Sequence, residues 1–370
     1  MKHRLVVLAL FLALCPHCTK HAPPQPPDAE PSRPEPSVDL AQVASAPSAL
    51  PAPSPSAEES PDAVSCDGDV CHVRTLSERA IAQLEKEKGH KTKRIEFRDD
   101  ASDEDLKNLS AIPWITRLVL SNCKTLTDLT PLAALKGLRE LSLENAANVV
   151  DIAPLAGLKE LTRLSLSGTS VENLAPLKDL QKLTRLDLRG VKAVDLLPLL
   201  GLTKLEALNV SGIKAKDWSP LARLKELRTL DASGSNLATA GPLATMKHLR
   251  KLNLAQCRDL KDIGALRVLR ELEQLRLDDV PITSVAAVGA MFDLQVLSMS
   301  GTKLADIKPL ETLGDLRSVD LQRTSVSNFD PLVSSAKSLK YLGLPKGTKP
   351  EQYAAISAAN RRLRPDIAKR

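Results

Sequence analysis

Three charged residues near the middle of the chain have a type and spacing suited to recognising a charged partner. Arg185, Asp187 and Arg189 are two residues apart, so an extended strand would place all three on one face. Guanidinium and carboxylate groups bind each other through paired, charge-assisted hydrogen bonds. The pattern predicts a surface that binds charged side chains of a partner. The alternative is a solvated polar face on which arginine and aspartate pair internally.

Catalytic patterns are missing from the sequence. Cys15 and Cys18 have the C-x-x-C spacing of a redox centre, but the prolines after them cannot form the helix that would lower the pKa of the first thiol. The six histidines are scattered, and the sequence contains no H-E-x-x-H motif, nucleophile elbow or glycine-rich phosphate loop. We therefore predict a protein that is not an enzyme, with no metal and no cofactor.

One repeated pattern supplies the elements that must position the charged residues. Between residues 92 and 347, L-x-x-L-x-L recurs twelve times at intervals of 22 or 23 residues, most clearly from Leu138, Leu161, Leu183 and Leu249. Each copy alternates apolar and polar residues, as a strand does, and continues with apolar residues at three-residue spacing, as a helical or 3₁₀ return does. A Pro-Leu pair recurs where that return begins, and proline is tolerated in a first helical turn. A short fixed period predicts a stack of coils.

The repeat resembles the leucine-rich repeat family, and specifically its bacterial internalin-like class with 22-residue coils. This resemblance implies an α/β fold: a right-handed, arc-shaped solenoid with a parallel β-sheet on its concave face, short helical or 3₁₀ segments on its convex face and helical caps. The family usually has Asn just after the strand. Here that position holds Thr, Ser, Cys, Val or Ile in most coils, so we expect a more apolar ridge with fewer hydrogen bonds. Cys123 and Cys257 occupy this position and are expected to be buried.

The solenoid is expected to span residues 92–347 between two caps. The N-terminal helical cap (66–91) should begin with a capping box at Thr75 and Glu78 and end near Lys88. Cys66 and Cys71 are predicted to form a disulfide in an oxidising compartment, with free thiols as the alternative. The C-terminal helical cap (348–370) should begin with Thr348 and Glu351. Its helix should contain Tyr353, Ile356 and Leu363.

The N-terminal region has the features of an export signal followed by a tether. Basic residues precede a short apolar run, so residues 1–14 are predicted to be a signal peptide. The run ends at Cys15, which resembles the acylated cysteine of bacterial lipoproteins, although Leu14 departs from the small residue usual before it. Residues 15–65 are rich in proline and are predicted to be a disordered tether. We expect an exported cell-envelope protein anchored to a membrane by lipid at Cys15, with simple secretion as the alternative.

The repeat period aligns the outward strand residues of all coils into rows. The first row contains Arg94, Arg117, Glu140, Arg163, Arg185, Ala207, Thr229, Lys251, Gln274, Val296, Ser318 and Tyr341. The second row contains Glu96, Val119, Ser142, Ser165, Asp187, Asn209, Asp231, Asn253, Arg276, Ser298, Asp320 and Gly343. Concave strand surfaces are the usual binding faces of solenoids.

These rows lead to a prediction of function. We expect a monomeric, non-enzymatic module that binds another protein through the following concave-face residues: Arg163, Arg185, Asp187, Arg189, Asn209, Asp231, Asn253 and Arg276. A net charge of +6 without a concentrated basic stripe does not favour nucleic acid. The alternative is a structural envelope protein that contacts anionic lipid or polymer through a basic edge formed by Lys136, Lys159, Lys225, Lys247 and Arg270.

Overall fold

The computed structural model describes residues 64–87, 94–97 and 101–367, which belong to one compact unit of the chain. The predicted signal peptide, the lipid attachment at Cys15 and the tether up to residue 63 lie outside the described residues, as does the start of the first repeat. Val64 and Ser65 were assigned to the tether, and the structure corrects this. Both are strand residues, because Val64 and Ser65 pair with Val73 and His72 across a hairpin.

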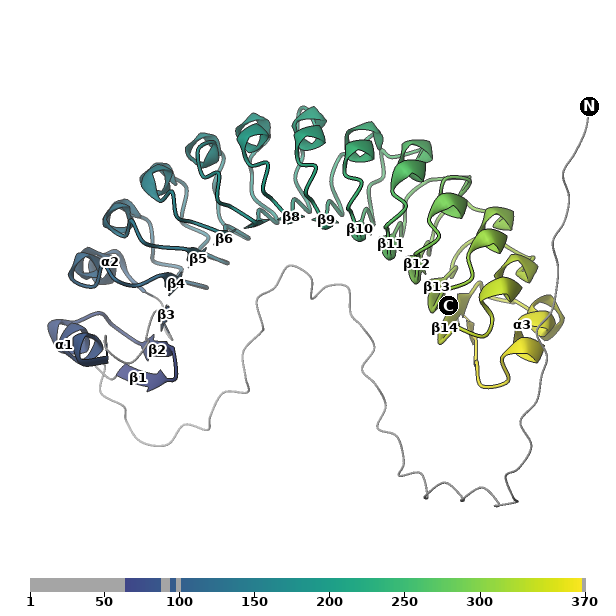
Figure 1. The fold of residues 1–370 in the computed structure, drawn as a ribbon, viewed down its shortest axis with the longest axis horizontal. Coiled ribbons are helices and arrows are strands. Elements are labelled where there is room, and N and C mark those ends of the chain that lie inside the picture. The colour runs from purple at the N-terminus through teal and green to yellow at the C-terminus, as the bar shows by residue number, and fades with distance from the viewer. Residues whose placement is uncertain (1–63, 88–93, 98–100, 368–370) are drawn as a thin grey trace, which may run out of the picture. The chain divides into compact units, whose positions relative to one another are not determined.

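The described coils stack into one sheet that lines the inner side of a curved solenoid (Figure 1). Its fifteen strands follow in chain order, and all neighbours are parallel except β1 and β2. The predicted parallel sheet is therefore confirmed. The strands are β1 Val64–Asp67, β2 Val70–Val73, β3 Arg94–Phe97, β4 Arg117–Val119, β5 Glu140–Ser142, β6 Arg163–Ser165, β7 Arg185–Asp187, β8 Ala207–Asn209, β9 Thr229–Asp231, β10 Lys251–Asn253, β11 Gln274–Arg276, β12 Val296–Ser298, β13 Ser318–Asp320, β14 Tyr341–Leu344 and β15 Asp366–Ile367.

The return path of each coil lies on the outer side of the solenoid and is a short 3₁₀ helix (Figure 1). All eight Pro-Leu prolines lie in the first turn of such a helix, as predicted. The segments are α2 Asp103–Lys107, η3 Asn108–Ala111, η4 Thr130–Ala134, η5 Ala153–Gly157, η6 Ala175–Leu177, η7 Leu197–Gly201, η8 Ser219–Arg223, η9 Gly241–Thr245, η10 Gly264–Val268, η11 Val288–Ala290, η12 Lys308–Thr312 and η13 Asp330–Ser335.

The repeated leucines fill a single hydrophobic core that runs the length of the stack. In the coil that begins at Leu161, the side chains of Leu161, Leu164 and Leu166 are at most 3 % exposed. Burying one leucine side chain contributes roughly 1.5–3 kcal/mol. Because each coil covers the apolar faces of its neighbours, the core extends without a break from Val64 to Leu363. The apolar positions of the motif therefore fix the strand positions that face outward.

One position per coil adopts the left-handed backbone conformation just after the strand. In ten consecutive coils it has φ between 57° and 77°, and non-glycine residues occupy it in five of them. The residues are Asn122, Asn145, Gly168, Gly190, Gly212, Gly234, Gln256, Asp279, Gly301 and Arg323. At Gly301 a side chain would also collide with Asp279 and with the guanidinium group of Arg323, which crosses this coil to bind Asp279 at 2.9 Å.

The residue after the left-handed position of each coil forms the ridge. The hydroxyls of Thr169, Thr302 and Thr324 donate to carbonyl oxygens three residues earlier in their own coils, each at 2.7 Å. Two ridge thiols reach the backbone of a neighbouring coil: Cys123 Sγ accepts from the Ala101 amide at 3.3 Å, and Cys257 Sγ donates to the Ala232 carbonyl at 3.1 Å. Both cysteines are buried, as predicted, and neither forms a disulfide.

The N-terminal cap combines a hairpin with a helix. Cys66 and Cys71 face each other across β1 and β2 and form a disulfide. Helix α1 (Glu78–Glu87) begins later than predicted from Thr75, because the amide of buried Leu76 donates to Asp105 of α2 at 2.8 Å and holds the preceding segment against the next coil. Ser77 accepts from the Ala80 amide at 3.2 Å in place of the predicted Thr75 cap.

The C-terminal cap is shorter in helix than predicted and adds a strand. The 3₁₀ helix η14 (Pro350–Tyr353) leads into α3 (Ala354–Ala359), and Gln352 accepts from the Lys349 amide at 2.7 Å at its start. Leu363 is buried but lies beyond the helix, which was predicted to include it. The helix stops because the Asn360 side chain donates to two carbonyls of the preceding coil, at 2.8 and 2.9 Å. The chain then pairs with β14 as β15.

Candidate partner-binding surface

The strand register aligns the outward residues as the sequence predicted. Arg163, Arg185 and Ala207 pair across successive strands, and so do Ser165, Asp187 and Asn209. The same register continues from β3 to β14, so the first row and the second row exist as listed above. The eight residues predicted to bind a partner lie on or directly after six consecutive strands, β6 to β11, on the concave side.

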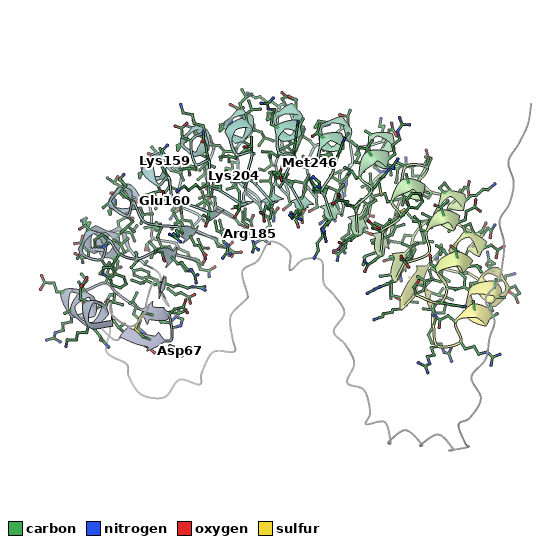
Figure 2. All side chains as sticks on the ribbon, in the orientation of Figure 1. Asp67, Lys159, Glu160, Arg185, Lys204 and Met246 are labelled. Atoms are coloured by element: carbon green, nitrogen blue, oxygen red, sulfur yellow. A yellow bond between two sulfur atoms is a disulfide. The ribbon has the colours of Figure 1, made fainter. Side chains whose placement is uncertain are left out.

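First-row side chains in the described part of the chain bond only to other side chains. Arg163 pairs with Glu140 at 2.8 Å, and Arg117 approaches the same carboxylate at 3.4 Å. Arg185 is exposed and makes no hydrogen bond or ion pair through its side chain with any described residue. Figure 2 shows the Arg185 side chain extending into the concave side of the solenoid. The first row therefore contains a cation whose hydrogen-bond donors are available.

Second-row aspartates and asparagines hold the backbone at the ends of their strands. Four of these side chains each accept a hydrogen bond from the backbone amide two residues further on, at 2.9–3.1 Å: Asp187, Asn209, Asp231 and Asn253. Asp320 repeats this contact at 2.9 Å. Asp231 also accepts from the Ser233 hydroxyl at 2.6 Å and from the Asn253 side chain at 2.9 Å. These side chains satisfy donors that the turn leaves without a partner.

The environment of Asp187 disfavours its charge. Burial raises the pKa of Asp187 to about 6, and the nearby carboxylates of Glu144 and Asp231 act in the same direction. The Arg189 amide and guanidinium group oppose this shift. Half of Asp187 is therefore protonated near pH 6, and the residue is a weaker anion than its type suggests.

The two remaining arginines of the predicted site are held by neighbouring residues. Arg189 follows β7 and crosses two coils, donating to Ser167 at 3.0 Å and pairing with Glu144 at 2.8 Å. The buried Nε of Arg276 lies 3.4 Å from the Asp278 carboxylate, an ion pair that lacks hydrogen-bond geometry. Arg185, Asp187 and Arg189 therefore have three different roles, and the proposed internal pairing of Arg189 occurs with a glutamate rather than with Asp187.

The basic edge is partly paired. Lys159 lies 3.5 Å from Asp179 of the next coil. Lys225, Lys247 and Arg270 are exposed, and their side chains make no ion pair within the described residues. These three follow one another in successive coils, so the edge presents three exposed cations without an ion pair among the described residues.

A further acidic column was missed by the sequence analysis. An aspartate or asparagine two residues before each of eight 3₁₀ helices accepts from that helix's first amide, at 2.8–2.9 Å. The signal was present in the sequence, because seven of these residues stand three places before a Pro-Leu proline. The residues are Asp128, Asp151, Asn173, Asp195, Asp217, Asp262, Asp306 and Asn328.

Metal-binding clusters and membrane-spanning helices are absent from the described residues. No cluster of three or more His, Cys, Asp or Glu side chains in them could hold a metal ion. Nor do they contain a helix with the length and apolar character that crossing a membrane requires.

Solved structures share this architecture. An internalin from Listeria monocytogenes is 22% identical and matches 73% of this chain and 80% of its own, with a TM-score of 0.66. A leucine-rich repeat protein from Leptospira interrogans is 19% identical over 80% of this chain and 93% of its own, with a TM-score of 0.54. The TLR13 chain of a complex with single-stranded RNA is 18% identical over 76% of this chain and 44% of its own, with a TM-score of 0.57.

No protein-family model and no curated protein sequence matches the chain. At such identities the structural neighbours share the fold. The repeat, the register and these neighbours together identify the fold as a leucine-rich repeat solenoid of the kind seen in internalins.

Proposed function

We propose that the protein is a non-enzymatic binding module whose concave face recognises another protein. The division of roles between the two rows supports this proposal. The aspartates and asparagines of the second row bind backbone amides, whereas the first-row side chains contact other side chains or none in the described residues. Arg185 carries the argument, because it is exposed, charged and without a partner among the described residues.

Capture of the partner from an envelope extract of the native cells tests this proposal. Arg185→Glu reverses the charge of an exposed side chain and leaves the strand contacts intact, so we expect it to lose the protein that the unmodified chain captures. Asp231 is unsuitable for this test, because its carboxylate accepts three hydrogen bonds of the fold.

Arg223→Glu is the matched control. Arg223 is an exposed arginine of η8 on the opposite side of the solenoid, and its side chain makes no ion pair with a described residue. Equal capture by Arg185→Glu and the unmodified chain would contradict binding through this face. Equal loss in both variants would show that net charge, rather than the concave face, holds the captured protein.

We propose further that a lipid on Cys15 and the proline-rich tether display this module from a membrane. The apolar run ending at Cys15 and the prolines after it support this proposal. Mass spectrometry of the mature N-terminus tests it. A diacylglyceryl group on Cys15 is expected, and an unmodified N-terminus further along the chain would indicate secretion instead.

The basic edge supports a second candidate function, contact with an anionic lipid or polymer. Lys225, Lys247 and Arg270 are the unpaired cations on which it rests. Binding to vesicles rich in anionic lipid should then weaken steeply as salt increases, because exposed charges are screened. Retention that is independent of salt would exclude this function.

A further inference from the structure

A hollow of about 360 Å³ lies at the amino ends of three neighbouring strands near the N-terminal end of the sheet. It is lined by Thr116 and Arg117 of the β4 coil, Arg139 and Glu140 of the β5 coil, and Thr162 of the β6 coil. Glu140 belongs to the first row, so the hollow adjoins the concave face. All five lining residues have polar or charged side chains, and two of them are arginines.

Positive charge in and around the hollow exceeds negative charge. The single carboxylate of Glu140 is shared by Arg163 at 2.8 Å and Arg117 at 3.4 Å, and Arg117 has Asp69 at 3.3 Å as its other partner. Glu160, which interacts electrostatically with Arg139, is already bound by Lys182 at 2.6 and 2.7 Å. Among the residues that line the hollow, Arg117 and Arg139 outnumber the single anion Glu140.

Two arginines in or beside the hollow have unused hydrogen-bond donors. Arg139 interacts electrostatically with Glu160, but its exposed side chain forms no hydrogen bond or ion pair within the part of the chain that the structure describes. Arg185 is equally free. Each guanidinium group offers five N–H donors in a plane that matches a carboxylate. Arg139 and Arg185 start two coils apart, ~9.6 Å at ~4.8 Å per strand, and their long side chains can reach groups between them.

We propose that this hollow binds the carboxylate side chains of an acidic segment in a partner protein, with Arg139 in the hollow and Arg185 beside it as the recognising residues. Arg185 adjoins the hollow because its amide donates to the carbonyl of Thr162 at 3.1 Å. This inference rests on the proposed function and names the chemistry of the partner. We prefer carboxylates to a phosphate polymer because the carboxylate of Glu140 already forms an ion pair of this kind with Arg163 at the hollow, at 2.8 Å.

Fluorescence anisotropy of the full chain with a labelled hexaglutamate peptide tests the proposal. We expect saturable binding that weakens as salt increases. Arg139→Gln should weaken it roughly tenfold, the effect expected when one charge-assisted contact is lost. A labelled hexaglutamine peptide should not bind, and equal binding of the two peptides would exclude recognition of carboxylates.

Arg228→Gln is the matched control for Arg139→Gln. Arg228 stands directly before β9, as Arg139 stands directly before β5, and it is likewise exposed and without an ion pair among the described residues. Its replacement should leave the affinity for hexaglutamate unchanged within about twofold. Equal weakening by both variants would show a diffuse basic edge and overturn the assignment to the hollow.

A six-nucleotide single-stranded RNA separates the proposed ligand from a phosphate polymer. Tighter binding of this RNA than of hexaglutamate, with the same loss in Arg139→Gln, would overturn the preference for carboxylates. The outcome is also distinct from that of the partner-capture experiment. If Arg185→Glu loses the captured protein but Arg139→Gln leaves peptide binding unchanged, the concave face binds a partner and the hollow does not take part.

Discussion

The two rows of the concave sheet differ in what their side chains contact, although they alternate along the same strands. Second-row side chains such as Asn209 and Asp231 bind backbone amides of their own coil. First-row side chains such as Arg163 bind other side chains, and Arg185 binds none in the described residues. Exposure on a solenoid face therefore does not by itself mark a binding residue. The row that the backbone does not use is the better candidate.

Asp231→Ala should give the largest effect, because it removes the acceptor of three hydrogen bonds. We expect a loss of about 2–3 kcal/mol in the free energy of unfolding, since the donors are left partly buried without a partner. Urea unfolding followed by circular dichroism measures this loss. Thr229→Ala, in the first row of the same strand, should change stability by less than about 1 kcal/mol. Equal losses would remove the distinction between the rows.

Asp187→Asn should raise stability by about 1 kcal/mol at pH 7.5, because the raised pKa reflects an unfavourable buried charge. Between pH 4 and 6 the folded chain keeps a proton on Asp187 that the unfolded chain has released. The stability of the unmodified protein therefore falls as pH rises through this range. Asparagine keeps the acceptor, as Asn209 does, and should flatten this dependence. Urea midpoints at pH 4, 5, 6 and 7.5 measure it, and identical pH profiles would contradict the assignment.

Arg276→Asn should stabilise the protein by roughly 0.5–1 kcal/mol. The substitution removes a buried Nε whose 3.4 Å ion pair with Asp278 lacks hydrogen-bond geometry, and it supplies the side-chain acceptor found elsewhere in the second row. Thermal unfolding can detect the gain as an increase in Tm. A loss of stability would mean that the 3.4 Å ion pair between Arg276 and Asp278 stabilises the fold more than the acceptor that asparagine supplies.

Arg185→Ala should have the smallest effect on stability, within about 0.5 kcal/mol of the unmodified protein. Its side chain is exposed and has no partner in the described residues, so its removal costs the fold nothing beyond minor packing. The same urea experiment measures this. A loss comparable to that of Asp231→Ala would show that the first row also holds the fold together.

The sequence was sufficient to predict the sheet, the strand register and the proline at the start of eight return paths. These features follow from apolar positions that repeat in phase, and a one-residue error would have turned Leu164 and its equivalents outward. The backbone contacts of Asp187 and Asn209 were not predicted, because an aspartate facing solvent and one binding an amide two residues away have the same place in the repeat. Hydrogen-bond geometry alone distinguishes them.

The caps were predicted in position but less well in detail. Thr75 and Thr348 had the spacing of capping boxes, yet Leu76 and Asn360 are bound to the neighbouring coils and shift where the helices begin or end. Such contacts join residues 21–32 positions apart in the chain. Local patterns do not contain this information. The left-handed position was missed for a related reason, since Gln256 and Arg323 occupy it as well as glycine.

The edges of the sheet determine whether molecules can join end to end. An open parallel strand would be a template on which another copy could continue the stack. At one edge, β1 runs antiparallel to the rest and is covalently tied to β2 through Cys66 and Cys71. At the other edge, β15 offers only Asp366 and Ile367 among the residues that the structure describes. Both edges therefore oppose growth into a filament, and the length of the solenoid is set within a single chain.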